Sequence, residues 1–78
     1  MSRTVEEMAR HRCLGDDGTP LIVVEYRHMF TSSDGGTVRR HPGARWLALL
    51  DGEPVRPIDA TTFEVVASGE MLRREGGD

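Results

Sequence analysis

The sequence predicts an all-β domain, a small antiparallel meander of about five to six strands curled into an open SH3-like barrel or sandwich. Three observations lead to this prediction. Segments of alternating apolar and polar residues, rich in valine and isoleucine, are typical of strands. Glycine follows a small polar residue at intervals of 17 residues, as tight turns require. The length of 78 residues suits a single small domain. The turns are at Asp17-Gly18, Asp34-Gly35, Asp51-Gly52 and Ser68-Gly69.

Composition excludes several classes of protein. Only 37% of the residues are hydrophobic, so the core is small and a large enzyme with a deep site is not expected. Cys13 is the single cysteine and cannot form an intrachain disulfide. The first ten residues are charged where a secretory signal is apolar, and no stretch approaches 18 apolar residues. We therefore expect a soluble, cytoplasmic protein that does not associate with membranes.

The N-terminal region allows two interpretations. Residues 4–7, Thr-Val-Glu-Glu, match a capping box that could begin a short helix. Residues 11–14 instead suggest a first strand that ends at the turn of Asp17-Gly18. We expect residues 1–7 to be a flexible or short helical lead and residues 8–74 to form the single β domain. The pattern leaves open whether residues 4–10 are helical or extended.

The long segment at residues 20–30 is the clearest strand. One face carries Ile22, Val24, Tyr26, His28 and Phe30, whereas the other becomes polar toward its end. Residues 31–44 follow, rich in serine, glycine and arginine, and we expect them to form a long Arg/Gly-rich loop.

The second half of the chain contains shorter strands. Residues 46–50 and 53–58 flank Asp51-Gly52 and predict a hairpin. Pro54 and Pro57 lack amide donors, so the returning strand should lie at an edge or be paired on one side only. Residues 62–67 and 70–74 flank the last turn, and residues 75–78 are expected to be a disordered tail. The predicted core comprises Ile22, Val24, Tyr26, Trp46, Ala48, Leu50, Val55, Ile58, Phe63, Val65 and Leu72.

Two stretches carry a resemblance to a known group of proteins. One is residues 15–18, Gly-Asp-Asp-Gly, with residues 23–27, Val-Val-Glu-Tyr-Arg. The other runs from Leu-Asp-Gly at residues 50–52, through Thr-Phe-Glu-Val at residues 62–65, to Leu-Arg-Arg at residues 72–74. Over residues 11–74 the chain resembles a group of small uncharacterised bacterial all-β proteins of unknown function. The resemblance implies a fold and carries no activity or site residue.

A basic segment is the main candidate for a binding site. Arg39, Arg40, His41, Arg45 and Trp46 lie in a stretch without acidic residues. Arginine binds phosphate and tryptophan stacks on bases, so this segment could bind single-stranded nucleic acid. The net charge of −3 argues against that alternative. A basic segment followed by an acidic second half instead favours a non-enzymatic module that contacts an unknown protein partner or forms a homo-oligomer.

Catalytic and metal sites are not expected. His11, Cys13 and His28 could supply metal ligands, but their spacing matches no recognised motif. No nucleophile is paired with a base in a pattern typical of catalysis. We therefore predict no enzyme activity, no catalytic residue, no metal and no cofactor.

Overall fold

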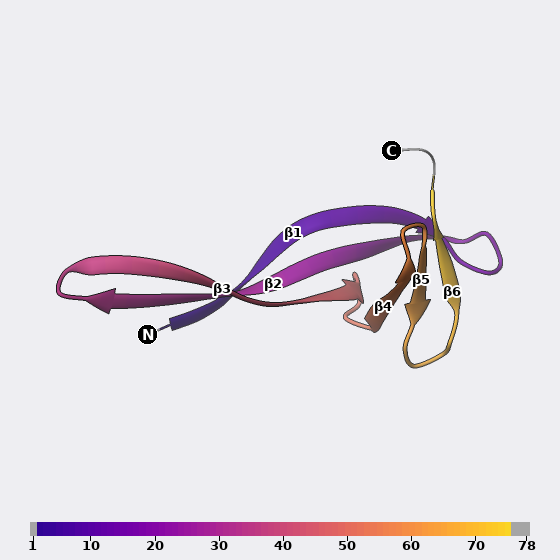
Figure 1. Ribbon diagram of the computed structural model, residues 1–78. Helices are drawn as coiled ribbons and strands as arrows, with labels where there is room; N and C mark the ends of the chain where they lie inside the picture. Colours follow the sequence, from indigo (N-terminus) through magenta and orange to yellow (C-terminus); the bar gives the residue numbers. More distant parts are fainter. Residues whose placement is uncertain (1, 76–78) are drawn as a thin grey trace.

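The computed structural model describes residues 2–75, which form six antiparallel strands (Figure 1). Each strand pairs with the next, and β1 also pairs with β6, so the sheet closes into a small barrel. The predicted all-β meander is confirmed, and the barrel is closed. Residues 2–75 contain no helix that could cross a membrane. The strands are β1 (Ser2–Leu14), β2 (Pro20–Asp34), β3 (Thr37–Leu49), β4 (Pro54–Asp59), β5 (Thr62–Val65) and β6 (Met71–Arg74).

The four predicted turns are all present. Their glycines have positive φ angles, which glycine adopts without the steric cost of a side chain. The polar residue before three of these glycines also accepts a hydrogen bond within its turn: Asp17 Oδ1 from the Thr19 amide at 3.0 Å, Asp51 Oδ1 from the Glu53 amide at 2.9 Å, and Ser68 Oγ from the Glu70 amide at 3.2 Å. Local turn chemistry therefore determines where the chain reverses.

The first three strands extend far beyond the barrel. β1 pairs with β6 only at Cys13 and Leu14, and β3 pairs with β4 only at Leu47 and Ala48. Beyond these positions β2 is the only neighbour of either strand. We call residues 2–10, 25–34 and 37–46 the arm; its β2–β3 hairpin projects to the left in Figure 1. The molecule measures 55 × 27 × 19 Å and has a radius of gyration of 15.6 Å, against about 11.5 Å for a compact chain of this length.

The arm corrects two predictions. Residues 2–7 are part of β1, and Ser2 pairs with Thr31, so the predicted flexible or helical lead is wrong for them. Residues 31–44 are not a loop, because β2 and β3 pair throughout and turn only at Gly35 and Gly36. Pairing on both sides of β2 gives hydrogen bonds to backbone groups of β2 that a helix at residues 4–7 would leave without partners. The predictions for Met1 and residues 76–78 lie outside the described residues.

The barrel core uses a different face of β2 from the one predicted. Leu21 and Val23 point inward, with Leu47 and Leu49 from β3. Both faces of these segments are apolar near the barrel, so alternation alone did not distinguish them. Val55, Phe63, Val65 and Leu72 lie in the core as predicted, together with Cys13. Val24 and Ala48 are also buried as predicted, although they lie on the outer face of the sheet. The other predicted core residues are not buried: Leu50 and Ile58 are 60% and 46% exposed, and Ile22, Tyr26 and Trp46 are half-buried on the outer face.

Two β-bulges separate the arm from the barrel. On β1, Met8 has no partner, because the pairing passes from Glu7 opposite Tyr26 to Ala9 opposite Glu25. On β3, Gly43 and Ala44 lie opposite the single residue His28. Each bulge inserts a residue, so alternation in β1 and β3 changes phase at these points.

The thiol of Cys13 is buried, which predicts slow alkylation and a stability that depends on pH. Burial raises the pKa of this thiol, so the unfolded chain forms the thiolate more readily than the folded protein. We expect iodoacetamide to alkylate the folded protein roughly tenfold more slowly, or slower still, than the unfolded chain at pH 8. The free energy of unfolding should also fall as the pH rises from about 8.5, the usual pKa of a thiol, through the higher pKa of the thiol in the folded protein.

Urea titrations between pH 7 and pH 10 would measure this second effect. A Cys13→Ala variant, compared over the same range, should lack the component due to the thiol. Equal alkylation rates for the folded and unfolded protein would show that the thiol is accessible.

Candidate binding surface and cleft

An aromatic stripe runs along the outer face of the arm. Tyr26, His28 and Phe30 are alternate residues of β2, and Trp46 of β3 lies opposite Tyr26. Side chains of directly paired residues share a face of the sheet. The rings form a continuous series: Tyr26 and Trp46 are stacked with centroids 5.4 Å apart, His28 lies 4.5 Å from Trp46, and Phe30 lies 6.3 Å from His28.

The apolar surface continues from the stripe onto the barrel wall. Val24 lies on the same face and is completely buried, although it is outside the barrel. Ala48, its partner on β3, is 4% exposed, and Ile22 extends the surface by one more position. On β1, Val5 pairs with His28 and is 54% exposed. We call the stripe together with Val5, Ile22, Val24 and Ala48 the outer face.

The bulge on β3 allows the stripe to pack closely. A β-carbon added at Gly43 would lie 2.5 Å from Cε2 of Phe30 and 3.1 Å from Cβ of His28. The first of these distances is well inside van der Waals contact, so any side chain at this position would displace the Phe30 ring. Glycine is therefore required here by the close approach of Phe30.

A Gly43→Ala substitution tests this packing. We expect the Phe30 ring to move and the free energy of unfolding to fall by about 1 kcal/mol. Near-ultraviolet circular dichroism during thermal unfolding would detect both the altered aromatic packing and the lower stability. The neighbouring exposed substitution Ala44→Ser should have little effect; an equal effect of both substitutions would contradict this account of Gly43.

The predicted basic residues are divided between the two faces of the arm. Arg39, His41 and Trp46 lie opposite outer-face positions of β2. Arg40 and Arg45 lie on the other face, where Arg40 forms an ion pair with Glu6 and Arg45 bonds to Glu25 at 3.1 Å. The structure therefore does not bring all five residues into one basic patch. These acidic partners were not evident from the sequence, because they come from distant positions on β1 and β2.

Charge is unevenly distributed along the molecule. The arm contains six arginines and four acidic residues, giving a net charge of +2. The rest of the sequence contains four arginines and nine acidic residues, giving −5. The long axis therefore joins a basic arm to an acidic barrel.

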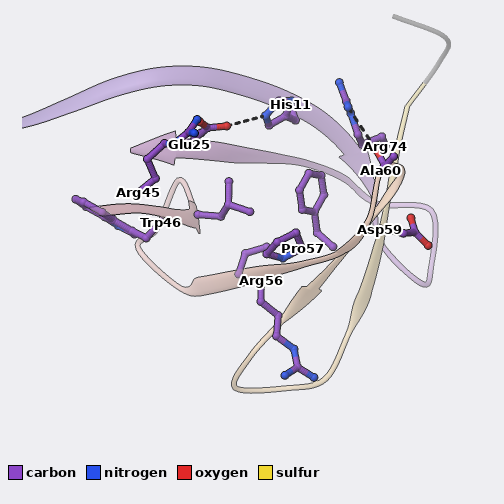
Figure 2. Close-up of a pocket in the computed structure, with 12 residues that line it drawn as sticks. His11, Glu25, Arg45, Trp46, Arg56, Pro57, Asp59, Ala60 and Arg74 are labelled. Carbon is purple, nitrogen blue, oxygen red and sulfur yellow. Dashed lines mark hydrogen bonds and ion pairs between the residues drawn. The ribbon is translucent and has the colours of Figure 1, made fainter. Parts of the chain in front are cut away.

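A cleft of about 600 Å³ lies where the arm diverges from β4 (Figure 2). It forms because β3 pairs with β4 only at Leu47 and Ala48, so the residues of β3 before Leu47 diverge from the residues of β4 after Val55. Its apolar lining, which we call the floor, comprises Leu47, Val55, Pro57 and Phe63. Trp46, at the unpaired edge of β3, lies at its outer end. No motif in the sequence indicated this cleft, because it depends on where two strands part.

The rim of the cleft is polar. Glu25 Oε2 accepts a hydrogen bond from Nη1 of Arg45, and Glu25 Oε1 lies 3.8 Å from Nε2 of His11. The His11 ring also lies 5.7 Å from the Phe63 ring, between centroids. On β6, Arg74 Nη1 donates to the Ala60 carbonyl at 3.4 Å.

The remaining charged residues of the rim are already engaged. Arg56 forms an ion pair with Glu64 and points away from the cleft in Figure 2. Asp59 Oδ1 accepts hydrogen bonds from the amide and the hydroxyl of Thr61. These bonds lower the pKa of the Asp59 carboxyl.

The three residues considered as metal ligands lie in different parts of the structure. Cys13 is in the barrel core, and its thiol contacts the His11 carbonyl at 3.7 Å. His11 lies on the rim of the cleft, whereas His28 belongs to the aromatic stripe. Within residues 2–75, no group of three or more His, Cys, Asp or Glu side chains is arranged to hold a metal ion.

Comparison with known protein families, with curated proteins and with solved structures finds no match to this chain. The resemblance to small bacterial all-β proteins therefore remains an expectation from the sequence. The outer face and the cleft are the features of this chain that bear on its function.

Proposed function

We propose that this protein is a non-enzymatic interaction module that self-associates, with two copies packing through their outer faces. The observation that carries this proposal is the row of half-buried aromatic rings from Phe30 to Tyr26, on the side of the sheet opposite the barrel core. Half-buried Ile22 extends this row beyond the buried Val24 and Ala48. Contiguous apolar surfaces of this kind are typical of sites of protein contact. Tyrosine and tryptophan are also enriched among the residues that dominate binding energy.

The architecture of the arm supports a protein partner. The arm consists of three strands without a second layer, and a sheet of this size depends on a hydrophobic face for its stability. The face that continues the barrel interior carries the ion pairs of Arg40 with Glu6 and Arg45 with Glu25. On the opposite face, the aromatic stripe lies between the Glu7–Arg10 ion pair of β1 and Arg39 of β3, and we infer that a partner covers this stripe.

The charge distribution favours a second copy in antiparallel orientation. When two molecules lie side by side and point in opposite directions, each basic arm faces the acidic barrel of the other. The same patch then serves both copies, so the interface closes with two-fold symmetry and does not propagate into a fibre. Because the outer face extends from the arm onto the barrel wall, this arrangement covers its full length.

Sedimentation equilibrium over a range of protein concentrations tests the proposal. We expect a mass of twice 8.7 kDa at high concentration, and the dimer should persist at high salt because burial of apolar surface drives its formation. A monomer at every concentration would contradict the proposal. If that monomer bound single-stranded oligonucleotides, with salt-sensitive amide shifts near Arg39, His41 and Trp46, the nucleic-acid alternative would replace it.

A further inference from the structure

We propose that the cleft between the arm and β4 binds a small, largely apolar anion, such as an aromatic or aliphatic carboxylate. Trp46 is the residue that this site shares with the outer face; the charged end of the site, at Arg74 and His11, lies on the barrel and does not depend on self-association. Its ligand would place an apolar body on the floor of the cleft and its negative charge beside Arg74 and His11.

The floor of the cleft suits an apolar body. A volume of about 600 Å³ lies within the range of small-molecule sites, which are mostly apolar with a few convergent polar groups. Phe63, Val55 and Leu47 form an apolar base, and Pro57 adds a rigid wall. Side chains from every strand of the barrel contribute to the lining, so closure of the barrel holds the cleft in shape.

Arg74 is the cation that favours an anion. Among residues 2–75 its guanidinium forms no ion pair within 4.0 Å, and the only hydrogen bond of that group found there is the long one to the Ala60 carbonyl. Arg45 and Arg56, the other two arginines of the cleft, are each paired with a glutamate. The guanidinium of Arg74 therefore retains donors for a carboxylate.

His11 lies close enough to contribute to the same site. Cys13 of β1 pairs with Arg74 of β6, and His11 lies two residues before Cys13 on the same face of β1. Diagonal neighbours of this kind are within reach of long side chains. Glu25 is paired with Arg45, whereas Asp59 accepts hydrogen bonds from Thr61 and keeps its negative charge. The formal charges of the rim therefore balance, and a bound anion depends on the free donors of Arg74, with His11 beside it.

Fluorescence titration with 8-anilinonaphthalene-1-sulfonate tests the site, because Trp46 is the only tryptophan and lines the cleft. We expect saturable binding of one probe per chain with energy transfer from Trp46. N-phenyl-1-naphthylamine has the same aromatic body without the sulfonate and should bind roughly fivefold more weakly or worse. Equal affinity for the two probes would overturn the assignment of an anion.

Paired variants locate the charge. Arg74→Gln should weaken sulfonate binding roughly fivefold or more, whereas Arg73→Gln, an exposed neighbour outside the cleft, should not. Ile22→Thr alters the outer face and should also leave affinity unchanged, which separates this site from the self-association surface. Equal losses in the Arg73 and Arg74 variants would overturn the proposal. If Arg74→Gln unfolds, wild-type affinity that is unchanged between low and high salt would overturn it instead.

Discussion

Replacement of Leu72 by alanine is expected to lower the free energy of unfolding by about 3 kcal/mol, enough to unfold much of the protein at 25 °C. Leu72 has no exposed surface and packs in the core with Cys13, Val23 and Phe63. The short strand β6 also closes the barrel through its pairing with β1. A cavity at this position therefore weakens both the core and the closure of the sheet.

Urea unfolding followed by far-ultraviolet circular dichroism would measure this loss. Leu50→Ala is the matched control, because Leu50 is 60% exposed and should cost less than about 0.5 kcal/mol. Similar losses in the two variants would show that the core does not lie where the structure places it.

A double substitution in the aromatic stripe is expected to abolish self-association. With Tyr26→Thr and Phe30→Thr, the dissociation constant of the dimer should rise roughly 100-fold or more, because each aromatic residue removed from the centre of an interface costs about 1–2 kcal/mol or more. Threonine retains a high β-propensity, so β2 should still form. Sedimentation equilibrium of the variant beside the wild type would give the change in dissociation constant.

Val38→Thr provides the control for this experiment. Val38 is an apolar residue of the arm, 65% exposed, that pairs with Ser33 on the face opposite the stripe. This control should dimerise like the wild type. A double variant that still dimerises with unchanged affinity would show that the stripe is not the interface, even if the protein is dimeric.

The features that sequence predicted correctly are those determined by local chemistry. Asp51-Gly52 between two apolar segments predicted a hairpin, and β3 and β4 pair on either side of it. The glycines after Asp17, Asp34 and Ser68 likewise marked reversals that the structure contains. In the second half, Phe63 and Val65 alternate with Thr62 and Glu64, so the pattern predicts which of them face the core, and both lie there.

The features that sequence reasoning missed depend on pairing between distant segments. Thr4 to Glu7 form part of a strand only because the end of β2 is available to pair with them. Val24 and Val23 are equally apolar, so only the closed barrel decides which of them points inward. The division of Arg39 and Arg40 between opposite faces also follows from strand pairing in a segment expected to be a loop.

The elongated shape makes the mode of association visible to small-angle X-ray scattering. A molecule 55 Å long and 19 Å thin extends much farther from its centre along one axis than along the others. Two copies lying side by side would double the forward scattering while raising the radius of gyration by only roughly a few ångströms, whereas an end-to-end pair would roughly double that radius. Because the molecule is elongated, the mass and the radius of gyration from one scattering curve together distinguish an antiparallel dimer from a linear one.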